Sequence, residues 1–389
     1  MGAGEPVSST WFTGARVVTP DGVLDGGGVY VVDGVIADVA GVGQRLPERA
    51  DELVDLAGCT VLPGFVDLHV HGGGGAGFDD GAAAITTGLA VHRANGTTRS
   101  LVSLVTAAPE EMERSVAAAA GYAAGDPTVL GIHLEGPFLS AERRGVHDPR
   151  ALQRPDPELF DRFLAAGHGA VRVLTLAPEL PGGMDLLRHA VAAGVHVAVG
   201  HSDAGYEFAL QAFSAGADLV THAFNGMRPM HHRDPVIIGA AMDAGVVLEA
   251  INDGVHLHEA TVWLLQSIAP GRVALITDAM EATCAPDGNY HLGAFAVEVT
   301  GGEARLADGT IAGSTLTMAV AVRRAVDLVG MSLVEAANAA SLVPARYLGV
   351  DDRYGSIRPG RAADLVITGA DLYVQAVLIA GRWLDDRRP

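Results

Sequence analysis

The sequence contains no lysine: all 26 basic residues of the 389-residue chain are arginine. This absence excludes any mechanism that needs a Schiff-base lysine, a P-loop lysine or a carboxylated lysine between two metal ions. Cysteine is nearly absent too, since Cys59 and Cys284 are the only two. Cysteines so far apart indicate neither a zinc knuckle nor a disulfide framework. We expect two free thiols in a reducing cytoplasm.

Long hydrophobic runs are also missing. Hydrophobic residues make up 49% of the chain, enough for a large core, but the apolar stretches are short and interrupted by Gly, Asp, His or Arg. We therefore predict no membrane-spanning segment. The first residues, MGAGEPVSSTWFTGARVV, lack a charged segment followed by an apolar one, so we expect no signal peptide.

Positive charge is scarce as well. The chain has 26 basic and 46 acidic residues, a net charge of −20. Such a balance argues against nucleic acid or an anionic membrane as a partner. A phosphorylated ligand would need a local cluster of arginine, histidine and backbone N–H groups to offset this charge.

Both ends of the chain have a β-rich pattern. Segments such as TGARVVTPDGV and GGVYVVDGVIADV near the start, and LYVQAVLIAGRWL near the end, show apolar alternation with Asp-Gly and Gly-Gly turns. Two β-rich ends around a different middle predict one small β-sandwich domain built from both termini. We assign residues 1–62 and 346–389 to this domain, and 63–345 to the middle.

The middle of the chain alternates short apolar segments with Ala-rich stretches of helical periodicity, such as EEMERSVAAAAGYAAG. This alternation predicts an α/β fold, a (β/α)8 TIM-like barrel rather than an open doubly wound sheet. The eight expected strands are 64–71, 98–106, 128–136, 170–179, 194–203, 217–225, 245–253 and 272–280.

Polar side chains follow five of these strands, at the barrel face where active sites are built. Residues i and i+2 of a strand share a face, so the pair His69 and His71 can reach one metal ion. Imidazole and carboxylate ligands suit zinc, and also iron, manganese or cobalt. The other candidates at strand ends are Glu135, His201, His222 and Asp278.

Each of these residues has a simpler explanation when taken alone. Glu135 and Asp278 could cap helices, and His201 could be a hydrogen-bonded core histidine. Their joint occurrence at predicted strand ends favours a metal centre. Six other histidines are expected to have no chemical role. His133 and His196 lie inside expected strands and should pack or form hydrogen bonds, and the others are expected to be surface or structural residues on helices or loops: His92, His168, His189 and His291. The run 72–75 is expected to be a flexible glycine loop.

Several motifs resemble the amidohydrolase superfamily and, within it, the N-acetylglucosamine-6-phosphate deacetylases. They run from about residue 10 to the C-terminus: GFVDLHVHG, GIHLEGPF, VGHSDA, THAFNGM, NDGVH, TDAM, GSTLTM and GSIRPGRAADLVI. The resemblance implies a cytoplasmic enzyme of amino-sugar catabolism and cell-wall recycling. It would hydrolyse the acetamide of N-acetyl-D-glucosamine 6-phosphate to D-glucosamine 6-phosphate and acetate.

The resemblance also implies roles for the candidate residues. Asp278 matches the catalytic acid/base. One or two divalent metal ions would bind each subunit, with zinc preferred. The principal metal site matches Glu135, His201 and His222, and a second site matches His69 and His71.

A further set matches the family's substrate-binding positions. His147 would contact the acyl group or the sugar, and four residues would bind the phosphate. Two of these, Arg233 and His256, would come from the neighbouring subunit of a homodimer. Simpler explanations stay open, since an Asn-Gly pair is an ordinary turn and the polar loop around Arg233 could merely be solvated. The other two phosphate-binding positions are Asn225 and Gly226.

Other functions remain open at this point. Candidates with the same metal centre are an N-acetylgalactosamine-6-phosphate deacetylase, a D-aminoacylase and a nucleobase deaminase. The last two would not need Arg233 and His256 around a phosphate. A catalytically dead barrel that serves as a scaffold is disfavoured by the complete ligand set.

Overall fold

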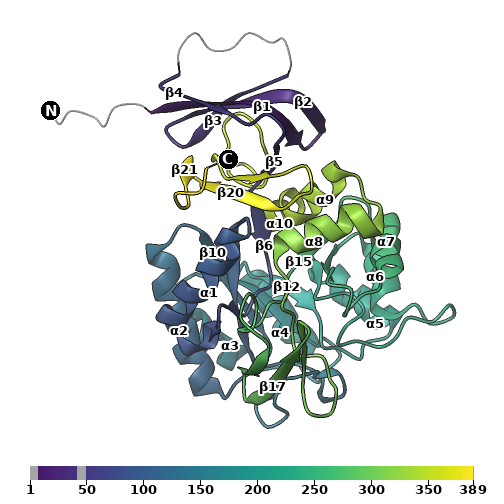
Figure 1. Ribbon diagram of the computed structural model, residues 1–389. Helices are drawn as coiled ribbons and strands as arrows, with labels where there is room; N and C mark the ends of the chain where they lie inside the picture. Colours follow the sequence, from purple (N-terminus) through teal and green to yellow (C-terminus); the bar gives the residue numbers. More distant parts are fainter. Residues whose placement is uncertain (1–7, 42–49, 389) are drawn as a thin grey trace.

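A parallel barrel forms the centre of the molecule in the computed structural model, which describes residues 8–41 and 50–388 (Figure 1). Eight strands are hydrogen-bonded in chain order, each parallel to the next. All eight predicted strands are present, and the predicted fold class is confirmed. The strands are β6 (Phe65–Asp67), β9 (Thr97–Val105), β10 (Val129–Glu135), β11 (Val171–Leu176), β12 (His196–Val199), β13 (Leu219–Val220), β14 (Val247–Ile251) and β15 (Val273–Ile276).

The barrel closes between its first and last strands just beyond their regular ends. Val70 and Ala279 form an isolated parallel bridge. The N–H of Asp278 donates to the His69 carbonyl at 2.8 Å, and the N–H of His71 donates to the Ala279 carbonyl at 2.8 Å. Candidate site residues on the two strands are therefore fixed side by side by the backbone itself.

Helices surround the barrel because each carries one apolar face. In α3 (Pro157–Gly167), Leu159, Phe160 and Phe163 are buried, and the Asp156 side chain caps the helix by accepting from the Glu158 N–H. No helix of the described ranges 8–41 and 50–388 is long and apolar enough to cross a membrane. The other helices are α1 (Ala82–Ala94), α2 (Pro109–Gly125), α4 (Gly183–Ala192), α5 (Tyr206–Ser214), α6 (Val236–Ala244), α7 (Glu259–Ile268), α8 (Met318–Arg324), α9 (Leu333–Ala340) and α10 (Leu342–Tyr347).

Strands from both ends of the chain form a second sheet, in the order β21-β20-β19-β5-β1-β2-β3, with β4 also paired to β1. The purple N-terminal strands and the yellow C-terminal strands lie together at one end of the barrel (Figure 1). They share one core, to which Phe12 and Ile36 contribute from one terminus and Leu378 from the other. The strands are β1 (Ser9–Thr19), β2 (Gly22–Val32), β3 (Val35–Ala40), β4 (Glu52–Asp55), β5 (Thr60–Pro63), β19 (Leu365–Thr368), β20 (Val374–Ile379) and β21 (Arg382–Trp383).

Two small β elements at the opposite end were not expected from the sequence. The glycine run after His71, expected as a flexible loop, forms a hairpin of β7 (Gly72–Gly73) and β8 (Ala76–Gly77). An antiparallel sheet of β16 (Gly288–Leu292), β17 (Phe295–Thr300) and β18 (Glu303–Arg305) follows the last barrel strand and packs its own apolar cluster. The alternating segment AFAVEVT between glycine turns is a strand signal that identifies it in retrospect.

Candidate active site

Strand ends bring the predicted metal-binding residues and Asp278 together at one rim of the barrel. Glu135 is the last residue of β10, and His201, His222 and Asp278 each lie two residues beyond a strand. These last three have positive φ angles of 46°, 27° and 48°. The left-handed region is costly for such residues, and strain of this kind concentrates at functional sites. All six side chains, including those of His69 and His71, are buried.

The carboxylate of Glu135 lies at the centre of the cluster. Its Oε1 is 3.1 Å from Nε2 of His201, 3.1 Å from Nε2 of His222 and 3.4 Å from Nε2 of His69. Its Oε2 is 3.3 Å from Nε2 of His71 and 3.5 Å from Nε2 of His147. One carboxylate thus faces five imidazoles.

Asp278 and two pairs of imidazoles complete the cluster. Oδ1 of Asp278 lies 3.5 Å from Nε2 of His69 and 3.4 Å from Nε2 of His71. The Nε2 atoms of His69 and His71 are 2.9 Å apart, and those of His201 and His222 are 3.0 Å apart. Two groups of side chains in this cluster have ligand atoms close enough together to hold a metal ion: His69, His71 and Asp278, and Glu135, His147 and His201.

The hydrogen bonds outside the cluster show what these volumes can hold. Nδ1 of His201 lies 2.8 Å from the Arg143 carbonyl, which can only accept, so Nδ1 is the donor and Nε2 is the nitrogen left to bind a cation. That nitrogen faces the carboxylate of Glu135, which is also a ligand for cations. A metal ion fits between them, because ligand atoms about 2.0–2.2 Å from a tetrahedral ion lie about 3.3–3.6 Å apart. The residues fit a divalent metal of this kind.

The electrostatics of the cluster favour positive charge. Burial alone would lower the pKa of His69, but Glu135, Asp278 and Glu249 raise it well above its usual value. His71 follows the same pattern: burial opposes, hydrogen bonds to Asp278 and Glu135 prevail, and its pKa rises to about 9. Burial would raise the pKa values of Glu135 and Asp278, yet the surrounding imidazoles lower both. The two carboxylates therefore stay ionised at neutral pH.

Buried polar residues behind the cluster form hydrogen bonds to its members, and most of these residues were not identified from the sequence. Asp67 accepts hydrogen bonds from the Thr277 hydroxyl at 2.6 Å and from the His69 N–H at 3.2 Å, and burial raises its pKa to about 7. Glu249 contacts His69 at 3.2 Å. Two signals could have found them. Asp67 lies two residues before His69 on the same strand face, and Glu249 is a carboxylate inside an apolar strand.

His133 occupies the barrel interior as the sequence predicted, inside a strand and hydrogen-bonded. Its Nδ1 lies 3.0 Å from the Ser103 hydroxyl and its Nε2 lies 2.8 Å from the Thr175 hydroxyl. Burial lowers its pKa well below the usual value, and the neighbouring His69 lowers it further. The neutral ring packs edge-to-face on His69, with centroids 4.5 Å apart.

A pocket of about 220 Å3 opens onto the cluster and receives most of the predicted substrate-binding residues. Gly226 is fixed there by its environment: a Cβ would lie 2.9 Å from Nδ1 of His201, and its φ is +58°. The Asn225 amide donates to the carbonyls of His222 and Ala223, at 3.3 and 3.2 Å, and so holds the turn. The other lining residues include His147 and His256, together with Leu292, Thr310, Ile311 and Gly313 from around the small antiparallel sheet.

His256 and Arg233, both expected to come from a neighbouring subunit, lie in different places in the structure. His256 lines the pocket of its own chain, so a second subunit is not needed to supply it; this corrects the expectation. Its Nδ1 lies 2.6 Å from Asp253, which raises the pKa of the ring against the effect of burial. Arg233 is exposed, contacts His232 and does not line the pocket.

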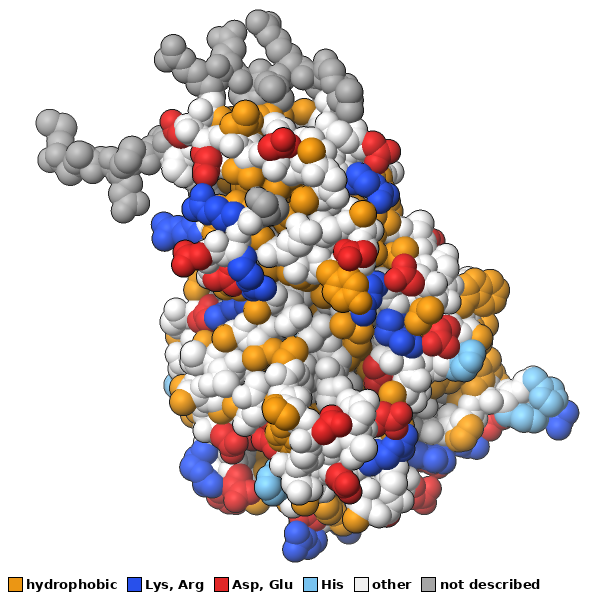
Figure 2. Space-filling model, viewed as in Figure 1, with side chains coloured by type: hydrophobic (Ala, Val, Ile, Leu, Met, Phe, Trp, Pro, Cys, Tyr) orange, Lys and Arg blue, Asp and Glu red, His pale blue; other side chains and the backbone are white. Residues whose placement is uncertain are grey.

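The segment 228–235, which carries Arg233, forms the projection at the right of Figure 1. In Figure 2, pale blue and blue side chains gather at the tip of this projection. Local sequence could not separate Arg233 from His256, because both are polar loop residues and only the path of each loop decides which reaches the pocket.

Comparison with known proteins shows the family of this fold and site. Residues 60–384 match the model of the amidohydrolase family. The chain belongs to the amidohydrolase family. Among its relatives is the N-acetylgalactosamine-6-phosphate deacetylase of Escherichia coli O157:H7, 37% identical over 94% of this chain and 97% of that protein. The N-acetylglucosamine-6-phosphate deacetylase of Bacillus subtilis is 35% identical over 94% of each chain.

The solved structures give the same result for this amidohydrolase. The N-acetyl-D-glucosamine-6-phosphate deacetylase of Mycobacterium smegmatis, determined as a mutant in complex with N-acetyl-D-glucosamine-6-phosphate, is 40% identical. It superposes with a TM-score of 0.92 over 97% of this chain and 99% of that chain. The resemblance read from the motifs is therefore confirmed.

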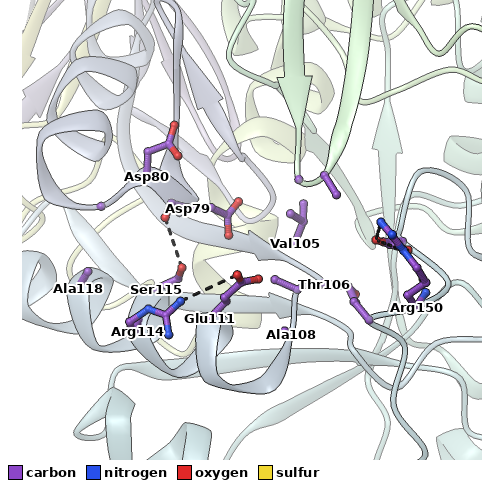
Figure 3. A pocket seen from close by; sticks show the side chains of 16 residues that line it. Asp79, Asp80, Val105, Thr106, Ala108, Glu111, Arg114, Ser115, Ala118 and Arg150 are labelled. Atoms are coloured by element: carbon purple, nitrogen blue, oxygen red, sulfur yellow. Dashed lines mark hydrogen bonds and ion pairs between the residues drawn. The ribbon is translucent and has the colours of Figure 1, made fainter.

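The amidohydrolase also has a larger cavity, of about 840 Å3, beside the rim (Figure 3). It borders the smaller pocket, because His147 lines one and Asp148 the other. Its arginines lie near carboxylates: Arg150 is 2.7 Å from Asp148, and Arg114 is 4.0 Å from Glu111. None of the metal-cluster residues lines this cavity, so its size does not make it the site of chemistry.

Proposed function

We propose that this amidohydrolase removes the acetyl group of N-acetyl-D-glucosamine 6-phosphate, releasing D-glucosamine 6-phosphate and acetate. One observation carries the proposal: Glu135, Asp278 and the facing imidazoles form a buried cluster that fits divalent metal and opens into the pocket containing His256 and the Asn225–Gly226 turn. Relatives that cover nearly the whole chain are deacetylases of acetamido-sugar phosphates. We place the reaction in the cytoplasm, which suits two cysteines that are both free.

One or two divalent cations would complete the site. Glu135, His201 and His222 would hold the first, and His69 and His71 the second, with Glu135 between them. When bound, such a cation, zinc by preference, activates water and polarises an amide carbonyl. The chain itself positions the acetamide and moves the protons.

Asp278 is the residue placed to move them. Its Oδ1 lies within 3.5 Å of both rim imidazoles, and the residue also lines the pocket. Because its pKa is lowered by His69 and His71 against the effect of burial, it is ionised and ready to accept a proton at neutral pH. It would take this proton from the water that attacks the carbonyl carbon and, as the C–N bond breaks, pass it to the departing amine of the sugar.

The phosphate would bind at the part of the pocket lined by His256 and the Asn225–Gly226 turn. His256 carries more positive charge near neutral pH than a free histidine, because Asp253 raises its pKa. The Gly226 backbone lines the same part of the pocket, while the Asn225 N–H already donates to the His222 carbonyl at 2.9 Å. A remote phosphate contact of this kind holds the acetamide in line for attack. We propose that Arg233 of a second subunit completes the contact, which makes the enzyme a homodimer.

The second candidate substrate is N-acetyl-D-galactosamine 6-phosphate. The Escherichia coli relative of that specificity is 37% identical, compared with 35% for the Bacillus subtilis enzyme, so identity does not separate the two epimers.

Acetate release from the two epimeric acetamido-sugar 6-phosphates tests the proposal. We expect the glucosamine epimer to give the higher kcat/KM, and we expect a chelator to stop the reaction and zinc to restore it. A non-phosphorylated N-acetylglucosamine serves as the control and should show a much higher KM. Preference for the galactosamine epimer would select the second candidate. Absence of turnover on both, with metal present, would refute the deacetylase.

A hybrid dimer tests the proposed sharing of Arg233. Asp278→Asn and Arg233→Ala subunits are co-expressed with different tags and the hybrid is isolated. If Arg233 acts across the interface, one of the two sites in the hybrid contains both native residues, and activity should return to about half of the wild-type value. A hybrid no more active than its parents would contradict the shared site.

A further inference from the structure

Glu249 of β14 contacts both halves of the metal cluster and does not line the pocket. It is 1% exposed. Its Oε2 lies 3.2 Å from Nδ1 of His69 and accepts the backbone N–H of His222 at 3.1 Å. The same oxygen therefore joins a histidine of the second proposed metal site to the backbone of one in the first.

This contact decides which nitrogen of His69 carries the proton. Because Oε2 of Glu249 already acts as an acceptor toward the His222 N–H, Nδ1 of His69 is assigned as the donor of its contact with the same oxygen. When a metal ion takes the place of the proton on Nε2, the lone pair of that nitrogen points toward the space beside Glu135 and Asp278, whose oxygens lie 3.4 and 3.5 Å away. A ligating histidine whose other nitrogen donates to a carboxylate has a fixed tautomer and ring orientation and is a stronger base.

His71 provides the contrast within the same site. Its Nδ1 has no hydrogen-bond partner among the residues that the structure describes. The orientation of the pair therefore depends on His69, which Glu249 holds from one side while His133 packs against the ring at 4.5 Å.

We propose that Glu249 is a positioning residue that fixes the tautomer of His69, anchors His222, and so links the occupancy of the two metal positions. This inference rests on the metal centre of the proposed function but not on its substrate. The competing explanation is that Glu249 only stabilises the barrel. Zinc binding without substrate separates the two, and it also separates failure of this inference from failure of the deacetylase assignment.

The experiment titrates metal-free full-length protein with Zn2+ and compares wild type, Glu249→Gln and Glu249→Leu. We expect the Leu variant to bind zinc about 10–100-fold more weakly at one or both positions, the usual cost of losing such a partner. Gln keeps an oxygen that accepts from Nδ1 and should recover part of the affinity. A His69→Ala background is the matched control. In that background the Glu249→Leu change should reduce zinc affinity clearly less, because only the contact of Glu249 with the His222 N–H remains to be lost.

A second readout follows the proton itself. In zinc-loaded wild type, 15N NMR should show the His69 proton on Nδ1, and in Glu249→Leu this signal should weaken or broaden. Wild-type zinc affinity in a folded Glu249→Leu protein would overturn the proposal, as would an equal loss of affinity with and without His69. If the Leu variant does not fold, the Gln variant is used instead. Wild-type zinc affinity in that variant, together with a 15N signal of His69 that changes with zinc as in the wild type, would also overturn the proposal.

Discussion

The two ends of the barrel bury charge in opposite ways. At the base, Arg99 of β9 forms a two-point ion pair with Asp364, at 2.7 and 3.0 Å, with the side chains 3% and 4% exposed. The Tyr354 ring stacks on the guanidinium, and Asp364 also accepts the Ala380 N–H at 2.7 Å. At the rim, by contrast, Nε2 of His201 faces a carboxylate oxygen of Glu135 at 3.1 Å, and a proton on that nitrogen or a metal ion is needed to join the two.

The difference separates a structural cluster from a functional one. At the base each carboxylate oxygen accepts from a donor, so the chain satisfies its own charges and joins the barrel to the terminal sheet. At the rim the facing nitrogens and oxygens are atoms that ligate cations, and a bound cation would stabilise the arrangement. Burial and charge are common to both ends, and the pairing of donors with acceptors distinguishes them.

The largest effect is expected at the rim, from Asp278→Asn. An amide oxygen cannot take up a proton, so kcat should fall by about 10²–10⁴-fold, the usual contribution of a general acid/base. Steady-state kinetics on the phosphorylated substrate measures the loss. Metal content and substrate affinity are the controls and should persist. Hydrolysis at the wild-type rate would show that another residue moves the proton.

The base should respond in stability and not in chemistry. Arg99→Leu leaves Asp364 buried without its partner, which typically costs about 3–5 kcal/mol of unfolding free energy. Chemical denaturation measures this loss, while kcat of the folded protein should stay at the wild-type value. The control is the double variant Arg99→Leu/Asp364→Leu, which removes both charges and should recover much of the stability. A large fall in kcat with unchanged stability would remove the distinction between the two ends.

The barrel strands and the residues at its rim could be predicted from the sequence, because the patterns that indicate them lie within short segments. Strand alternation indicated the eight barrel strands, and His69, Glu135 and Asp278 were identified by their positions at strand ends. A residue at the end of a parallel strand meets its counterparts on other strands whatever lies between them. The rim was therefore predictable from short segments.

The supporting contacts were not predictable in this way. Glu249 meets His69 across 180 positions of sequence, and Arg99 meets Asp364 across 265. No pattern of either segment alone specifies such a pair. The three-stranded sheet at the pocket was not predicted, because the segment 288–305 lies after the last expected barrel strand and outside the expected terminal domain.

The smallest effect concerns a buried imidazole that faces neither a carboxylate nor a metal position. Nε2 of His92 lies 2.8 Å from the Gly72 carbonyl, and burial lowers the pKa of the ring although this contact opposes the shift. An unfolded histidine has a pKa of about 6.5. Below that pH the unfolded chain binds a proton that the folded chain does not, so folding stability should fall as pH decreases and should be independent of His92 above it.

Subtracting a non-titrating variant isolates this contribution. His92→Asn keeps an N–H donor for the Gly72 carbonyl, and the lowered pKa values of His133 and His147 act equally in both proteins and cancel. The difference in unfolding free energy, wild type minus variant, should be flat from pH 8 to about 6.5 and decline below it. A difference that rises as pH falls would mean that His92 shares the field of the rim carboxylates. His92, on α1, would then have to be grouped with the histidines of the metal cluster and not with the structural ones.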